Sequence, residues 1–172
     1  MIEEALWKIL AFILAVILLF VAPLITLYDR QDAITYSVVF SAVSEFSDVT
    51  RELGVVREQN LHQLLGTLSA TGNTYDVQLE HYKKVYVPIY DPAGVFMDDY
   101  YTSYEGVFNT DIYAVLNSVD SYPMNAGDLF FIQIENTSKT RSQVAKSLLF
   151  NISGDYPTIV VRNGGLVRYE SH

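Results

Sequence analysis

The chain has 172 residues, a formal net charge of −9 at pH 7 and no cysteine. The lack of cysteine excludes disulfides, thiolate metal sites and cysteine nucleophiles, and an acidic chain lacks the clustered Lys and Arg that nucleic-acid binding requires. After an N-terminal segment of about thirty residues, the remaining length suffices for one ordinary globular domain.

The N-terminal segment is strongly apolar. Residues 9–28 carry no charged side chain, whereas Lys8 precedes them and Asp29 follows. About 20 apolar residues, in a helix rising about 1.5 Å per residue, cross a hydrocarbon core of about 30 Å. A cleaved secretory signal has a basic start and a shorter apolar core of about 7 to 15 residues. We therefore expect residues 1–28 to form an uncleaved transmembrane helix.

Residues 29–172 are expected to form an extracytoplasmic globular domain. They hold most of the acidic charge and are rich in tyrosine, asparagine and threonine. Lys8 and Arg30 flank the apolar run on opposite sides, so the positive-inside rule gives little guidance of its own. The expected localisation is a membrane anchor with an extracytoplasmic head.

An amphipathic stretch follows the anchor. Apolar residues recur every three to four positions from Ile34 to Leu53, which is the period of a helix with one buried face. No strong helix breaker separates this stretch from the apolar run, so one long helix is predicted to end near residue 54. Pro23 removes one backbone donor and predicts a kink in that helix.

The middle of the chain changes from helix to strand. Residues 57–70 predict a second helix with its leucines on one face, and the alternation that begins at Tyr75 predicts a strand. Pro88 either ends this strand or confines it to a sheet edge. The aromatic, turn-rich residues 90–106 predict a long surface loop.

The C-terminal half mixes helices and strands. A short helix is predicted over residues 110–119, a buried strand over 128–135, and a helix from the capping residues 136–140 through Phe150. The apolar face of that last helix is Val144, Ala145, Leu148 and Leu149. Asn163-Gly164-Gly165, between strand-like segments 158–162 and 166–169, predicts a β-hairpin turn.

Together these elements predict an α+β fold. A long N-terminal helix, apolar in its first half and amphipathic in its second, precedes a small head with an antiparallel β-sheet and short helices. Residues 1–28 are the membrane part, and the globular domain over residues 29–172 includes the amphipathic continuation of the helix to about residue 54.

The sequence offers no recognisable catalytic constellation. His62, His81 and His172 lie on different predicted elements, and no G-x-S-x-G or phosphate-loop motif occurs. We therefore predict that the protein is not an enzyme and that it has no cofactor, metal site or small-molecule substrate. The acidic residues of loop 90–106 are expected to be solvated, with a calcium site or a glycan there as the alternatives left open.

The layout of the first 54 residues resembles the type IV pilins and pseudopilins, including Tad-type and archaeal filament subunits. The resemblance implies that the apolar half of the helix anchors the subunit in the membrane and later packs in the filament core, as the filament-core helix. It also implies that the amphipathic half lies under a β-containing head, with Pro23 close to the kink of that family. The residues expected to contact lipid or neighbouring helices are Leu6, Ile9, Phe12, Ile13, Val16, Leu19, Phe20 and Pro23.

Two glutamates at the mouth of the apolar run are candidates for subunit registration. The family carries a glutamate near the fifth mature position, which can pair with the terminal amine of an adjacent subunit. In this chain Ala5 occupies that position, and Glu3 and Glu4 are the nearest acidic residues. Charged residues at the end of a span are also ordinary interfacial residues.

Two functions are compatible with these features. The first is a pilin-like structural subunit of an extracellular filament, located at the cell surface when assembled. The second is a single-pass accessory protein of a secretion, conjugation or competence apparatus that acts by protein–protein contact. The expected partners are the membrane and either other copies of the chain or envelope-machine proteins.

Overall fold

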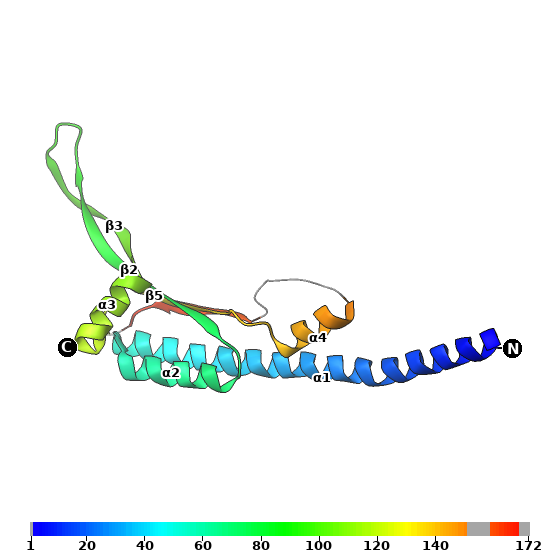
Figure 1. Cartoon of the computed structure of the whole chain (residues 1–172). Coiled ribbons are helices and arrows are strands. Elements are labelled where there is room, and N and C mark those ends of the chain that lie inside the picture. The colour runs from blue at the N-terminus through cyan, green and yellow to red at the C-terminus, as the bar shows by residue number, and fades with distance from the viewer. Residues whose placement is uncertain (1, 151–158, 169–172) are drawn as a thin grey trace. The chain divides into compact units, whose positions relative to one another are not determined.

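The computed structural model describes residues 2–150 and 159–168, and its fold is α+β (Figure 1). Helix α1 (Ile2–Leu53) is 52 residues long and continues through Pro23, as the sequence predicts for one long helix. The other helices are α2 (Glu58–Ala70), α3 (Asn109–Val119) and α4 (Arg141–Phe150). The strands are β1 (Val55–Arg57), β2 (Tyr75–Tyr90), β3 (Phe96–Phe108), β4 (Ser121–Pro123), β5 (Leu129–Asn136) and β6 (Val160–Leu166).

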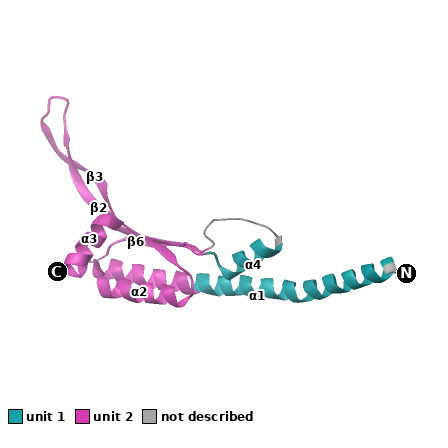
Figure 2. Cartoon of the chain, in the orientation of Figure 1, with its two compact units in different colours: residues 1–37, 139–156 teal, residues 38–138, 157–172 magenta. Residues whose placement is uncertain are grey.

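The chain divides into two compact units, which Figure 2 colours separately. The described part of residues 1–37 and 139–156 forms the first, here called the anchor unit, which holds the N-terminal part of α1 together with α4. The described part of residues 38–138 and 157–172 forms the second, called the head unit. Helix α1 therefore contributes to both units.

The head unit contains a four-stranded antiparallel sheet in the order β3-β2-β5-β6, and a separate antiparallel pair of β1 with β4. Strand β2 pairs with β5 from Tyr75 to Tyr82, whereas its pairing with β3 extends from Glu80 to Tyr90. The segment of β2 after Tyr82 has β3 as its sole partner among the described strands. The β2–β3 hairpin thus projects from the sheet as an arm (Figure 1).

The core lies between the sheet and the head part of α1. Along β5, alternate side chains are buried, which places Phe130, Ile132 and Ile134 on the inner face. Phe46 of α1 contacts Phe130, with ring centroids 6.3 Å apart. Each such fully buried side chain contributes about 1.5 to 3 kcal/mol through the hydrophobic effect. The predicted packing of the sheet on the amphipathic half of the helix is therefore confirmed.

The buried face of α1 differs from the predicted stripe in part. Val39 and Val43 are fully buried, whereas Ile34 and Leu53 are exposed. The predicted stripe includes Thr50, which is buried, but the face that packs in the head unit also contains buried Ser47, which was predicted to lie between the apolar positions.

The predicted hairpin at Asn163-Gly164-Gly165 is wrong, because β6 runs straight through these residues and pairs with β5. A Cβ atom on Gly164 would press against the carbonyl oxygen of Phe130 and lie 2.6 Å from the Cα of Phe131. The glycines permit close approach of two strands instead of a turn. Residues 158 and 169 of the predicted hairpin lie outside the described residues.

The predicted surface loop over residues 90–106 is also wrong in most of its length, because β3 occupies its second part. The turn itself is short: Asp91 Oδ1 accepts hydrogen bonds from the backbone N–H groups of Ala93 and Val95. Tyrosine and phenylalanine favour strands, and here they pair across the hairpin. Pro88 lies where β2 has β3 as its described partner, which fits the predicted edge position.

The short helices begin close to their predicted positions, but their caps differ. For α3 the sequence offers Asn109 or Thr110 as the cap, but the side chain of Asn109 bonds to β2 through the N–H of Leu79 and the carbonyl of Val77. Thr140, within the predicted capping segment of α4, forms a reciprocal pair with Gln143: the Thr140 N–H donates to Gln143 Oε1, and the Gln143 N–H donates to Thr140 Oγ1. This pair is a capping box, which satisfies backbone donors in the first turn.

Candidate membrane and assembly surfaces

The N-terminal part of α1 is exposed on all sides. Its most apolar 18-residue window has a mean hydropathy of 3.0, and none of that window is buried. The helix is therefore long and apolar enough to cross a membrane. The core helix of a soluble protein has a similar composition but is mostly buried, which this segment is not.

The residues predicted to contact lipid or neighbouring helices recur every three to four positions, so they share one face of this helix, and the other sides are apolar and exposed as well. Leu6, Phe12 and Leu19 are 60%, 71% and 71% exposed, and Val16 is exposed as well. A helix that is apolar around its whole circumference needs an apolar surrounding on every side. Ile9, Ile13 and Phe20 are likewise exposed, and Pro23 lies within the helix.

Glu3 and Glu4 are exposed and lie in the first turn of α1. Acidic side chains there interact favourably with the positive end of the helix dipole. This placement leaves both carboxylates accessible to a neighbouring chain.

Directly after the apolar run, α1 is bound to α4 by polar contacts. Thr140 Oγ1 donates to Asp32 Oδ2 at 2.6 Å, and Lys146 Nζ lies 2.6 Å from Asp29 Oδ1. Ser142 Oγ also donates to Asp29. The hydrogen bonds from Lys146 and Ser142 lower the pKa of the Asp29 carboxyl below its usual value of 3.8.

The predicted apolar face of α4 is largely uncovered. Val144 and Leu149 are 43% and 45% exposed, and Leu148 is 81% exposed. Their side chains therefore contribute little to a core within the chain, and they constitute a second apolar surface in the anchor unit.

The hairpin arm of the head unit has a third unusual surface. Every residue of β3 is exposed or half-buried, and Tyr86, Tyr100 and Tyr101 are each more than half exposed. Aromatic rings contact one another along the arm, as in the tilted contact of Phe96 with Tyr100 at 5.2 Å between centroids. Exposed tyrosines are common in protein interfaces because each ring combines a large apolar face with a hydroxyl group.

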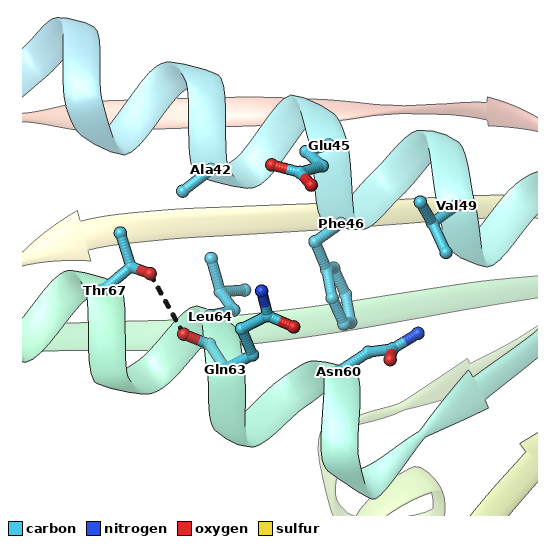
Figure 3. A pocket seen from close by; sticks show the side chains of 8 residues that line it. All are labelled: Ala42, Glu45, Phe46, Val49, Asn60, Gln63, Leu64 and Thr67. Carbon is cyan, nitrogen blue, oxygen red and sulfur yellow. Dashed lines mark hydrogen bonds between the residues drawn. The ribbon is translucent and has the colours of Figure 1, made fainter.

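A groove of about 150 Å³ lies between α1 and α2 in the head unit (Figure 3). Phe46 and Leu64 are buried beneath it, while Glu45, Asn60 and Gln63 supply polar groups at its edge. The Thr67 hydroxyl donates to the backbone carbonyl of Gln63, so it is already engaged within α2. The groove is smaller than ordinary small-molecule sites, which occupy about 300 to 1,000 Å³.

One buried polar cluster was missed by the sequence analysis. His81 Nε2 lies 2.9 Å from Asp128 Oδ2, and His81 Nδ1 lies 2.8 Å from the Tyr122 hydroxyl. Asp128 also accepts hydrogen bonds from the backbone N–H groups of Lys84 and Asn125. The signal was present in the sequence, since His81 follows Val77 and Leu79 on the inward side of the alternating strand.

Burial and hydrogen bonding shift the titration of this cluster. Burial lowers the pKa of His81 below 6.5, although the hydrogen bond and charge of Asp128 oppose this shift. Burial by itself raises the pKa of Asp128, but the hydrogen bonds from Lys84, Asn125 and His81 outweigh it and hold that pKa below 3.8. His81, Tyr122 and Asp128 are all buried, so no substrate can reach them and their role is to position β2, β4 and β5.

The other histidines do not join this cluster. His62 Nε2 lies 3.3 Å from Glu58 Oε1 on the surface of α2, and His172 lies outside the described residues. Within residues 2–150 and 159–168, no group of three or more His, Asp or Glu side chains is arranged to hold a metal ion.

No protein-family model matches the chain, and no curated protein or solved structure matches it either. The function must therefore be argued from the surfaces themselves.

Proposed function

We propose that the protein is a pilin-like structural subunit of an extracellular filament, anchored by the apolar part of α1 before assembly. The observation that supports this proposal is the change in surroundings along one uninterrupted helix. Residues 3–20 of α1 are all exposed, whereas Val39 and Val43 are fully buried in the head unit. One part of the helix thus packs in the core of the head unit, and its N-terminal part is an exposed apolar segment.

The apolar segment requires a cover that its own chain does not supply. Each fully exposed Leu, Ile or Phe side chain forgoes about 1.5 to 3 kcal/mol of hydrophobic stabilisation. Lipid provides that cover for a single subunit, and packed copies of the same helix provide it in a polymer. Leaving the membrane is then coupled to assembly, because the segment moves from one apolar surrounding directly into another.

The alternative proposal is a single-pass accessory protein of a secretion, conjugation or competence apparatus. The hairpin arm favours this function, since it exposes aromatic side chains at a distance from the sheet (Figure 1). In this case the apolar helix stays in lipid, and the arm contacts another component of the apparatus. Both proposals place the head on the extracytoplasmic side, with the membrane as a partner.

Fractionation of cells that produce the full chain tests the two proposals. The filament proposal expects the protein in fibres released by shearing, labelled along their length by an antibody against the head. Recovery of the protein exclusively with detergent-solubilised membranes would contradict the filament proposal and favour the accessory protein. Protease added to intact spheroplasts should digest the head in either case, and protection of the head would contradict both.

Replacement of residues 9–28 by an unrelated apolar helix of equal length gives a sharper distinction. A polyleucine-alanine helix still anchors the chain, because insertion depends on hydrophobicity and length. Filament packing depends on the shapes of the side chains that meet neighbouring helices. Retained function after this replacement would therefore count against the filament, and loss of fibres with retained anchoring would support it.

A further inference from the structure

The polar contacts of α4 determine its direction along α1. Thr140, at the start of α4, bonds to Asp32, and Lys146, further along α4, bonds to Asp29. Residue numbers therefore increase along α4 in the direction in which they decrease along α1. Helix α4 is antiparallel to α1, and it advances from the charged residues toward the apolar run.

The end of α4 consequently lies beside the apolar run. Leu148 follows Lys146 by two residues, which is about 3 Å along a helix axis, and so lies past the level of Asp29. One face of α1 is half-buried at Tyr28, Ile25 and Val21, at the helical spacing of three to four residues. That face continues the line of Asp32, to which α4 is bound.

Two apolar side chains of α4, Val144 and Leu148, point away from this contact, whereas Leu149 lies about 60° around the helix from Lys146. Ser142 and Lys146, one turn apart, face Asp29. Val144 and Leu148 form a second line one turn apart, about 160° around the helix from the first. Leu148 is 81% exposed and Val144 is 43% exposed, so this line faces the surroundings of the anchor unit.

We propose that the apolar side of α4 lies in the interfacial layer of the membrane, as a second and shallower lipid contact beside the span. The proposal rests on the membrane anchoring proposed above. A span over residues 9–28 places Asp29 at the boundary of the hydrocarbon, and the ion pair with Lys146 then holds Leu148 and Leu149 within one turn of that boundary. Apolar side chains of interfacial helices are buried to a similar depth of about 5 to 10 Å.

The charges of α4 are compatible with a lipid surface, although Lys146 is already paired with Asp29. Arg141 and Lys146 are basic, and α4 contains no acidic residue. Basic side chains at the edge of an interfacial helix are attracted to anionic headgroups. A second copy, with its net charge of −9, would attract basic residues as well, so the choice of lipid rests on the place of α4 beside the apolar run.

Tryptophan fluorescence in vesicles tests this proposal, because the chain has one tryptophan, Trp7, two residues before the proposed span. The full chain is reconstituted in phosphatidylcholine–phosphatidylglycerol vesicles, with or without bromine at carbons 6 and 7 of the acyl chains. Trp7 reports insertion of the span. Leu148→Trp in a Trp7→Phe background reports the position of α4, and Ser37→Trp in the same background is the control, about 12 Å along α1 beyond Asp29.

The expected result is quenching of both Trp7 and the tryptophan at position 148. The tryptophan at position 148 should lose about half of its emission, and the control Ser37→Trp should remain unquenched. Quenching of Trp7 without quenching at position 148 would overturn the proposal for α4 and leave the anchor intact. A blue shift at position 148 that rises with protein density without quenching would likewise overturn it and indicate contact between copies. Absence of quenching at both positions would overturn the anchor and the proposal together.

Discussion

His81 donates a hydrogen bond from Nε2 to Oδ2 of Asp128 across 2.9 Å, and both side chains are almost completely buried. The ionised carboxylate accepts, so the Nδ1 atom of the neutral ring accepts in turn from the Tyr122 hydroxyl. This arrangement uses the neutral form of the imidazole and fixes its tautomer.

The head is therefore expected to lose stability in mild acid. The pKa of His81 is lower in the folded state than its ordinary value of 6.5, so its contribution is complete above that pH and is lost as the pH falls through the folded value. The lowered pKa of Asp128 acts in the same direction at lower pH. Urea unfolding in detergent, followed by tyrosine circular dichroism, should give a smaller free energy of unfolding at pH 5.5 than at pH 7.5.

Replacement of the histidine isolates its part of this dependence. His81→Gln should cost about 2 kcal/mol or more at pH 7.5, because it disturbs buried hydrogen bonds, and it should weaken the dependence on pH. His62→Gln, at an exposed histidine, serves as the control and should change neither quantity appreciably. An unchanged pH dependence in His81→Gln would show that another group titrates.

Two glycine-to-alanine substitutions should change stability in opposite directions. Gly164→Ala places a methyl group against the backbone of Phe130 and Phe131, and should destabilise the head by about 2 kcal/mol or more. Gly66→Ala, in α2, meets no described atom within 4 Å and should stabilise it by about 0.5 to 1 kcal/mol. The same urea titration measures both, and equal effects would contradict the role given to Gly164.

Lysine substitutions in the apolar run should prevent insertion of α1 into the membrane only when two are combined. The fourteen Leu, Ile, Phe and Val residues between positions 9 and 28 favour insertion by about 4 to 8 kcal/mol, and each Lys at the centre costs about 2.5 to 3.5 kcal/mol. Val16→Lys should remain in the membrane fraction but lose filaments, whereas Val16→Lys with Leu19→Lys should leave the membrane. Val119→Lys, at an exposed position of α3, is the control. Membrane association of the double variant at the wild-type level would contradict the proposed span.

Glu3→Ala and Glu4→Ala, combined, distinguish registration of subunits from an interfacial role. If a glutamate pairs with the amine of a neighbouring subunit, fibres should become scarcer or irregular in negative-stain micrographs while the subunit stays in the membrane. Glu52→Ala, an exposed residue in the last turn of α1, provides the matched control. Regular fibres in normal numbers would remove the registration role.

Shortening the hairpin arm should leave the stability of the head nearly unchanged. Residues 86–102 contain no buried side chain, so their replacement by Asn-Gly should alter the free energy of unfolding by less than about 1 kcal/mol. If the arm binds an envelope component, co-purification of that component should be lost with it. A loss of stability well above 1 kcal/mol would show that the arm supports the core.

The elements with strong periodicity were predictable from sequence, and the elements that depend on close backbone contact were not. The long helix, α2 and β5 follow from apolar spacing. Gly164 and Gly165 were misinterpreted because glycine serves tight turns and close strand approach equally well. The second strand of the arm, β3, was predicted as part of a loop because residues 90–106 contain many turn residues when they are considered apart from the strand with which they pair.

The candidate surfaces were predictable to a different degree. Composition alone located the apolar run, since lipid exposure leaves all sides of a helix apolar. The burial of His81 was predictable from the alternation along its strand, but its partners were not, because Tyr122 and Asp128 reach it from segments 41 and 47 residues away. The exposure of Leu148 was missed as well, since an apolar face predicts burial without specifying what covers it.

The hydrogen bond between Asn163 Nδ2 and Ser44 Oγ joins residues 119 positions apart. A ribosome that adds about 5 to 20 residues per second needs about 6 to 24 seconds to make the chain between them. Early in this interval, before β2 and β5 are made, Val39, Val43 and Phe46 have no strands of the sheet to pack against, although the apolar run before them is already complete. If the apolar run is a membrane anchor as proposed, the order of synthesis lets the membrane receive the helix first, and the head closes around its far end only when translation is almost finished.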